Sequence, residues 1–284
     1  MMEIKNVGVI GCGQMGGGIV QTCAQAGYDV RVSEVNDAFL TKGLNAIKSN
    51  LSRNVEKGRM TKEEMDAVLG RIHGTTNTAD FSDRDLVVEA VIENMEMKKK
   101  LFAELDKICP AGAILATNTS CLSIIDMAMV TKRADKVLGI HFFNPVPVMK
   151  LVEVVKTIAT GAETVSIGKQ FGEKCGKKVV IAQDSPGFIV NRLMIPFILN
   201  AIRMMDGGIA TKEDIDAGCN LGLNHPMGPL ALADLIGLDT VYFIAAAMYA
   251  ELKDPQFVSP PLLGKMVTAG WLGRKTGKGF YDYK

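Results

Sequence analysis

The chain has 284 residues, 48% of them hydrophobic, and carries 32 Lys and Arg against 31 Asp and Glu. Because no stretch gathers one sign of charge, we expect neither a nucleic acid nor a membrane as a partner. The six cysteines are scattered, with no CxxC pair and no neighbouring histidine, so we expect no disulfide framework and no metal site. The N-terminus lacks a leader pattern, which favours a cytoplasmic protein.

The first half of the chain alternates short β-branched runs with longer amphipathic ones. This pattern predicts an α/β fold of the Rossmann type, with a largely parallel sheet and helices on both faces. The expected strands are Asn6–Ile10, Asp29–Ser33, Leu86–Val91, Ile114–Thr117, Val137–His141, Leu151–Val155 and Lys178–Ile181. Residues 36–69 are predicted to form an inserted helical pair, since Thr61 and Glu64 have the spacing of a capping box.

The second part of the chain is mainly helical and is predicted to be a separate, smaller, all-helical domain. We place the boundary at Asp184, giving domains 1–184 and 185–284, with Pro186 at the first helical position. The helical domain holds more apolar residues than it can bury alone, so we expect it to form a homodimer or higher homo-oligomer. We also expect this domain to close over the substrate. These apolar residues include Met194, Ile195, Phe197, Ile198, Leu230, Leu232, Leu235, Tyr242, Phe243 and Ile244.

A dinucleotide-binding fingerprint follows the first strand, which runs directly into Gly11-Cys12-Gly13-Gln14-Met15-Gly16 and then an apolar helix. In this context Gly11 permits the tight turn, Gly13 lets the backbone approach the pyrophosphate and Gly16 lets the helix pack on the sheet. Glu34, at the end of the second strand, is placed to bind the adenosine ribose. Its charge would repel a 2′-phosphate, so NAD is preferred over NADP, although Arg31 and Lys42 lie near in sequence.

His141 is the candidate general base, because histidine exchanges protons near neutral pH and this one lies at the carboxyl end of a predicted strand. If Val137–Phe143 and Leu151–Val155 pair around Pro147, Glu153 faces His141 and can orient its imidazole. The alternative is that Glu153 simply points to solvent. His73 and His225 lack a comparable position.

Three further polar residues have two interpretations each. Asn118 and Ser120 follow a strand end, where they either face the ligand crevice or cap the next helix. Asn191, about one and a half turns into the helix predicted from Pro186, is either a satisfied core amide or a group that binds the substrate oxygen. A basic stretch with Lys48, Arg53, Lys57 and Arg59 is either solvated or binds phosphates.

Several motifs together resemble the 3-hydroxyacyl-CoA dehydrogenase family, over essentially the whole chain. They are Gly11–Ile19, Ala116–Ser120, His141–Pro145, Asp184–Arg192, His225–Pro229 and Gly273–Tyr281. The compact length is most like that of the stand-alone bacterial members that act on 3-hydroxybutyryl-CoA. The resemblance implies NAD-dependent interconversion of 3-hydroxyacyl-CoA and 3-oxoacyl-CoA, with an acyl-CoA as the partner molecule.

The resemblance also implies residue roles. His141 would be the general base and Glu153 its partner, while Ser120 and Asn191 would hydrogen-bond the substrate. Glu93, Lys98 and Asn118 match positions used around the cofactor, and Lys57 matches a lysine used for CoA.

Two alternative functions stay open from the residues alone. One is another two-domain dehydrogenase of the 3-hydroxy acid or 6-phosphogluconate type, which would place a lysine where this chain has Asn191. The other is a dinucleotide-binding protein of the same fold without catalytic activity.

Overall fold

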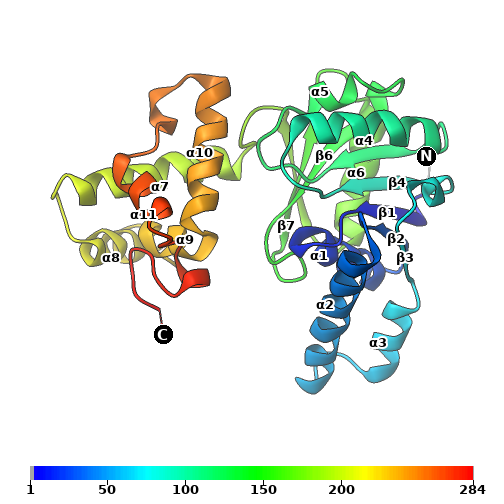
Figure 1. The fold of residues 1–284 in the computed structure, drawn as a ribbon, viewed down its shortest axis with the longest axis horizontal. Helices are drawn as coiled ribbons and strands as arrows, with labels where there is room; N and C mark the ends of the chain where they lie inside the picture. The colour runs from blue at the N-terminus through cyan, green and yellow to red at the C-terminus, as the bar shows by residue number, and fades with distance from the viewer. Residues whose placement is uncertain (1–2, 284) are drawn as a thin grey trace. The chain divides into compact units, whose positions relative to one another are not determined.

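The computed structural model describes residues 3–283 and divides the chain into two compact units, unit 1 (Met1–Asp184) and unit 2 (Ser185–Lys284). Unit 1 is an α/β layer structure around one sheet, and unit 2 is helical (Figure 1). This is the expected fold class, a Rossmann-type domain followed by an all-helical one.

The sheet of unit 1 has the strand order β3-β2-β1-β4-β5-β6-β7-β8, and β6 and β7 are its antiparallel neighbours. All its other neighbouring pairs are parallel. The strands are β1 (Asn6–Ile10), β2 (Asp29–Ser33), β3 (Ile72–Thr75), β4 (Leu86–Glu89), β5 (Ile114–Thr117), β6 (Val137–Phe142), β7 (Leu151–Lys156) and β8 (Lys178–Gln183). The seven expected strands are confirmed, with small changes at their ends, but the edge strand β3 was not predicted.

Helices cover both faces of this sheet. Val7 and Val9 share a buried core with Ile19 of α1, whereas Gly8 between them faces Phe81 on the opposite side. The helices of unit 1 are α1 (Gln14–Gln25), α2 (Asp37–Glu56), α3 (Lys62–Leu69), α4 (Met95–Ile108), α5 (Ile124–Ala128) and α6 (Ala162–Lys174), with short 3-10 turns η1 (Thr78–Phe81) and η2 (Ala134–Lys136). Burial on both faces explains why the central strands are almost continuously apolar.

The inserted pair α2 and α3 extends away from the sheet, as Figure 1 shows in blue and cyan. At the start of α3 the Thr61 hydroxyl accepts a hydrogen bond from the Glu64 backbone N–H, and the Glu64 carboxylate accepts one from the Thr61 N–H. The predicted capping box is therefore confirmed, and with it the helical pair.

Unit 2 is built from five helices around its own core. They are α7 (Val190–Asp206), α8 (Lys212–Gly222), α9 (Pro229–Ile236), α10 (Leu238–Leu252) and α11 (Pro261–Thr268), with 3-10 turns η3 (Pro255–Phe257) and η4 (Arg274–Thr276). The apolar residues expected to be in excess differ in burial, and Met194, Phe197 and Leu232 are intermediate. Ile195, Ile198, Leu230 and Ile244 are buried, but Leu235, Tyr242 and Phe243 are 40–50% exposed.

Helix α7 begins later in the chain than predicted, at Val190 rather than at Pro186. Pro186 is not helical, because Gly187 and Phe188 adopt left-handed backbone angles, with φ of 77° and 47°, and form a turn before the helix. The helix begins at Val190, so Asn191 is its second residue rather than one and a half turns inside it.

Candidate active site

The glycine loop between β1 and α1 has the geometry of a dinucleotide site. Gly11 has a φ of 96°, and a Cβ on Gly16 would lie 1.9 Å from the Gly11 carbonyl oxygen, so neither position accepts a side chain without strain. A Cβ on Gly13 would meet no atom within 4 Å, which leaves the backbone there open to a ligand. No side chain caps the first turn of α1, so its N–H groups can bind a pyrophosphate.

A cavity of about 400 Å³ adjoins this loop. Its wall includes Gly13, Gln14, Glu34 and Lys42, so the fingerprint and the acid after β2 belong to one site. Met15, the second residue of α1, packs against the core of the sheet. These residues fit an NAD adenosine and pyrophosphate.

Glu34 is fixed at the edge of this cavity. One carboxylate oxygen accepts a hydrogen bond of 2.7 Å from the Cys12 backbone N–H, which holds the acid against the glycine loop. Burial, and to a smaller extent the Glu34 charge, raise the pKa of the Cys12 thiol to about 11, so this thiol is neutral. Of the two nearby cations, Lys42 lines the cavity, whereas Arg31 donates to the Asp80 carbonyl instead.

His141 and Glu153 form a buried pair across the antiparallel strands β6 and β7. The two residues are register partners, and His141 Nδ1 lies 2.7 Å from Glu153 Oε2. The Glu153 side chain has no exposed surface, and that of His141 has 7%. A carboxylate so buried requires a hydrogen-bonded partner, and the imidazole provides one. The alternative that Glu153 points to solvent is therefore wrong.

Asn118 links the end of β5 to the histidine strand. Its side-chain oxygen accepts a hydrogen bond of 2.9 Å from the backbone N–H of Phe142, the residue after His141. Its own N–H donates to the Glu89 carbonyl on β4. Asn118 thus connects three neighbouring strand ends at the edge where open α/β sheets bind ligands.

Ser120 follows in the same turn and is half-buried. Within the turn, the Thr119 hydroxyl accepts a hydrogen bond from the N–H of Leu122, and helix α5, which begins at Ile124, is capped by Asp184. The Ser120 hydroxyl is therefore not needed as the cap. The Asp184 carboxylate binds the N–H groups of Ile124 and Ile125 at the start of α5 and so fixes the other end of the segment.

Glu93 and Lys98 lie beside this turn, but Lys98 is 1% exposed and donates 2.6 Å to Glu89 Oε1. Glu93 accepts a hydrogen bond of 3.0 Å from the Ser120 N–H. Sequence reasoning missed Glu89, a fully buried acid that ends β4. The available signal was a carboxylate inside an otherwise apolar strand pattern, because such a charge is buried only when it is paired.

Two predicted site residues, Asn191 and Lys57, make none of the contacts described above. Asn191 belongs to unit 2, where it is buried in the first turn of α7. Lys57 is the exposed C-cap residue that follows α2, four residues after Arg53, so both can present their charge on one side of that helix end. Their roles toward the substrate stay predictions.

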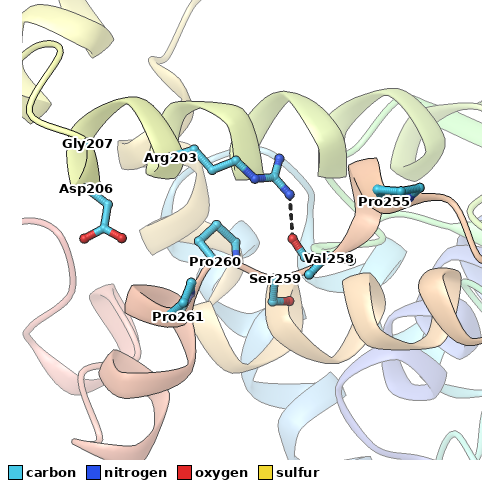
Figure 2. Close-up of a pocket in the computed structure, with 8 residues that line it drawn as sticks. All are labelled: Arg203, Asp206, Gly207, Pro255, Val258, Ser259, Pro260 and Pro261. Carbon is cyan, nitrogen blue, oxygen red and sulfur yellow. Dashed lines mark hydrogen bonds between the residues drawn. The ribbon is translucent and has the colours of Figure 1, made fainter.

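A larger hollow, of about 580 Å³, lies in unit 2 between the end of α7 and the segment Pro255–Pro261 (Figure 2). Two charged side chains line it, Asp206 and Arg203, and Arg203 donates a hydrogen bond of 2.5 Å to the Val258 carbonyl. The wall also includes Pro255, Pro260 and Pro261. None of the predicted site residues lines it. We therefore assign the chemistry to the smaller cavity and the strand ends of unit 1.

Within residues 3–283, no three His, Cys, Asp or Glu side chains gather as a metal site. Over the same residues no single helix is long and apolar enough to cross a membrane. The bent pair α9 and α10, with 96° between its helices, passes that test only when taken together.

Comparison with known families matches both units. The family model described as "3-hydroxyacyl-CoA dehydrogenase, NAD binding domain" covers residues 6–185, and the model described as "3-hydroxyacyl-CoA dehydrogenase, C-terminal domain" covers residues 187–283. Together they span nearly the whole chain.

Individual relatives match at full length. A 3-hydroxybutyryl-CoA dehydrogenase of Mycobacterium tuberculosis is 48% identical over 282 residues, which is 99% of each chain. A probable 3-hydroxybutyryl-CoA dehydrogenase of Bacillus subtilis is 48% identical over 283 residues, which is 100% of this chain and 99% of the relative. The crystal structure of M. tuberculosis FadB2 covers all of both chains with a TM-score of 0.97 and 48% identity. That of (S)-3-hydroxybutyryl-CoA dehydrogenase PaaH1 from Ralstonia eutropha has a TM-score of 0.95 and 42% identity, over 99% of this chain and all of its own.

Proposed function

Since the chain belongs to the 3-hydroxyacyl-CoA dehydrogenase family, we propose that it is an NAD-dependent enzyme that interconverts (S)-3-hydroxybutyryl-CoA and acetoacetyl-CoA. The observation that carries this proposal is the buried His141–Glu153 pair at the ligand-binding edge of an NAD-binding sheet. The full-length similarity to 3-hydroxybutyryl-CoA dehydrogenases supports the choice of the four-carbon substrate.

When bound, NAD supplies the acceptor for the hydride that leaves carbon 3 of the substrate. His141 removes the hydroxyl proton at Nε2, while Nδ1 stays bonded to Glu153. The carboxylate fixes the ring orientation and stabilises the imidazolium that forms. In the reductive direction the same imidazolium returns the proton to the carbonyl oxygen.

The other predicted residues complete the proposal. Ser120 and Asn191 bind the substrate oxygens, and Lys57 binds a phosphate of CoA. Glu93, Lys98 and Asn118 order the strand ends beside the cofactor, as their contacts in unit 1 support. We further propose a cytoplasmic location, because all six cysteines are free thiols, as expected in a reducing compartment.

We expect the purified protein to oxidise NADH when acetoacetyl-CoA is added and to form the (S)-3-hydroxy product. Loss of NADH absorbance and chiral analysis of the product measure this directly. Free acetoacetate is the matched control and should turn over poorly, since it lacks the binding energy of the CoA portion. Failure to oxidise NADH with acetoacetyl-CoA and with every longer 3-oxoacyl-CoA would refute the proposed reaction.

Replacing Glu34 with Gln should weaken NADH binding by about tenfold, because a charge-assisted contact with the ribose is lost. The affinity for NADPH should fall less than that for NADH, or should rise, since the repulsion of its 2′-phosphate is removed and Lys42 lines the same cavity. The dissociation constants of NADH and NADPH, measured for the wild type and the variant, give the ratio of the two affinities. Asp37→Asn, which removes an exposed acid three residues away and outside the cavity wall, is the control and should leave that ratio unchanged.

We propose that unit 2 forms a two-fold dimer through exposed apolar side chains of α10, which include Tyr242, Phe243 and Tyr249. Sedimentation should show a dimer at micromolar concentration, and Phe243→Asp should shift it toward monomer. Met129→Asp, which places the same charge on an exposed residue of unit 1, should stay dimeric. A wild-type chain that sediments only as a monomer would contradict the dimer.

A further inference from the structure

Glu89 and Lys98 form a buried ion pair near the turn that carries Ser120. Glu89 is 0% exposed and Lys98 is 1% exposed, and their charged atoms are 2.6 Å apart. Glu89 accepts two further hydrogen bonds, of 2.6 Å from the Val91 N–H and of 2.7 Å from the Thr117 hydroxyl. Its carboxylate therefore joins the ends of β4 and β5 to helix α4.

Lys98 carries this connection to Glu93. The ammonium lies 3.2 Å from Glu93 Oε2, and the other oxygen of Glu93 accepts hydrogen bonds from the Thr119 hydroxyl and from the Ser120 N–H. Burial, followed by the charge of Glu93, raises the pKa of the adjacent Cys121 thiol to about 12, so that thiol adds no further charge. An unbroken series of polar contacts thus runs from Glu89 to the backbone of Ser120.

We propose that Glu89 is a positioning residue for Ser120, acting through Lys98 and Glu93. Because one ammonium is shared by two carboxylates, its place between them is set by the charge on both. Because Glu89 binds the Lys98 ammonium on one side, Glu93 meets it with one oxygen only and directs its second oxygen to the Ser120 N–H. This inference rests on the proposed role of Ser120 in binding the substrate.

The contacts of Glu89 allow its charge to be tested separately from its shape. Three donors converge on its two carboxylate oxygens: the Val91 N–H and the Lys98 ammonium on Oε1, and the Thr117 hydroxyl on Oε2. In a Glu89→Gln variant, the amide oxygen can still face Lys98 and Val91, and the amide N–H can donate to the Thr117 oxygen. The variant therefore preserves shape and removes mainly the charge, so Lys98 should move toward Glu93 and disturb its bond to Ser120.

The test is a double-mutant cycle between Glu89→Gln and Ser120→Ala on the full-length enzyme, measured as kcat and KM for acetoacetyl-CoA. Glu89→Gln should lower kcat by about tenfold when Ser120 is present, since small displacements of a positioning group cost this much or more. In the Ser120→Ala background the same change should cost less than about twofold, because the group that it positions is already gone.

Asp106→Asn is the matched control, because Asp106 and Arg133 form another ion pair in unit 1 with side chains only 9% and 10% exposed. It should lower the melting temperature as Glu89→Gln does but leave kcat within about twofold in both backgrounds. If Glu89→Gln does not fold, Glu89→Asp, which keeps the charge but withdraws it from Lys98, replaces it and should give a smaller loss that again vanishes with Ser120→Ala.

Equal losses of kcat in the two backgrounds would overturn the positioning role, while the proposed reaction would stand. No effect of Ser120→Ala alone would instead refute the proposed function of Ser120, and the inference about Glu89 with it. If Glu89→Gln lowers kcat tenfold only when Ser120 is present, the result supports both the role of Ser120 in binding the substrate and the positioning role of Glu89.

Discussion

Replacing His141 with Gln is expected to lower turnover by about 1,000-fold, because proton transfer by a positioned side chain contributes a factor of this order. Glutamine occupies a similar volume but cannot accept a proton at neutral pH. The affinity for NADH should change little, since His141 lies on β6, away from the glycine loop and Glu34. Single-turnover measurement of NADH oxidation separates the chemical step from product release.

Glu153→Gln should reduce the same rate by about 100-fold or more, because the amide no longer stabilises the imidazolium and can fix the wrong tautomer. If the two residues act as one unit, the double variant should be little worse than His141→Gln alone. If the loss of rate in the double variant equals the product of the losses in the two single variants, Glu153 contributes separately from His141, as a buried structural acid. In that case the observed distance of 2.7 Å would not be a catalytic contact.

The His141–Glu153 contact could be predicted because strand pairing follows simple rules. Residues 137–143 and 151–155 have the strand pattern, and the short link around Pro147 allows only an antiparallel return. Once the turn centre is fixed, the period of two determines which side chains face each other. The structure confirms both the pairing and the register.

Glu89 could not be assigned in the same way, because no rule of strand register links it to its side-chain partners Lys98 and Thr117. Thr117 is 28 residues away, and Lys98 projects from a helix whose orientation the sequence does not define. The edge strand β3 was missed for a related reason. Its residues Ile72–Thr75 are few and include a glycine, so only pairing with β2 makes them a strand.

The turn before α7 shows where local rules mislead. Ser185 and Pro186 have the pattern of a helix start, but Gly187 and Phe188 take left-handed conformations that a helix cannot include. The surroundings of Gly187 in the folded chain, rather than the local sequence pattern, determine where the helix begins. A Cβ on Gly187 would lie 2.5 Å from the flexible terminal methyl of Met248 and 3.0 Å from the backbone nitrogen of Arg192, and the φ of 77° strains any residue that has a side chain, so glycine is favoured there.

The C-terminal motif Gly273–Tyr281, which helped to indicate the family, has a structural explanation in unit 2. The buried Asp234 on α9 accepts hydrogen bonds from the N–H groups of Phe280 and Tyr281 and from the Tyr283 hydroxyl, at 2.9–3.0 Å. Burial and this carboxylate raise the pKa of Tyr283 to about 12, so its hydroxyl donates throughout the neutral range. The carboxylate therefore fastens the tail to the helical core.

Asp234→Asn should consequently destabilise unit 2 by about 3 kcal/mol, because the amide N–H would face a donor and the remaining bonds lose their charge. Trp271, the single tryptophan of the chain, lies in unit 2, so its fluorescence during urea unfolding reports on this unit. Asp239→Asn is the control in the same unit. Asp239 pairs with Lys275 at the surface, where the side chains are 40% and 46% exposed.

That exposed pair should contribute less than about 1 kcal/mol, since water screens it. The two variants remove the same chemical group, so a difference between them measures burial and hydrogen bonding rather than net charge. NADH affinity should be unchanged in both, because the fingerprint and its cavity lie in unit 1. Equal and small destabilisation by the two substitutions would show that Asp234 does not fasten the tail, and the motif Gly273–Tyr281 would then need another explanation.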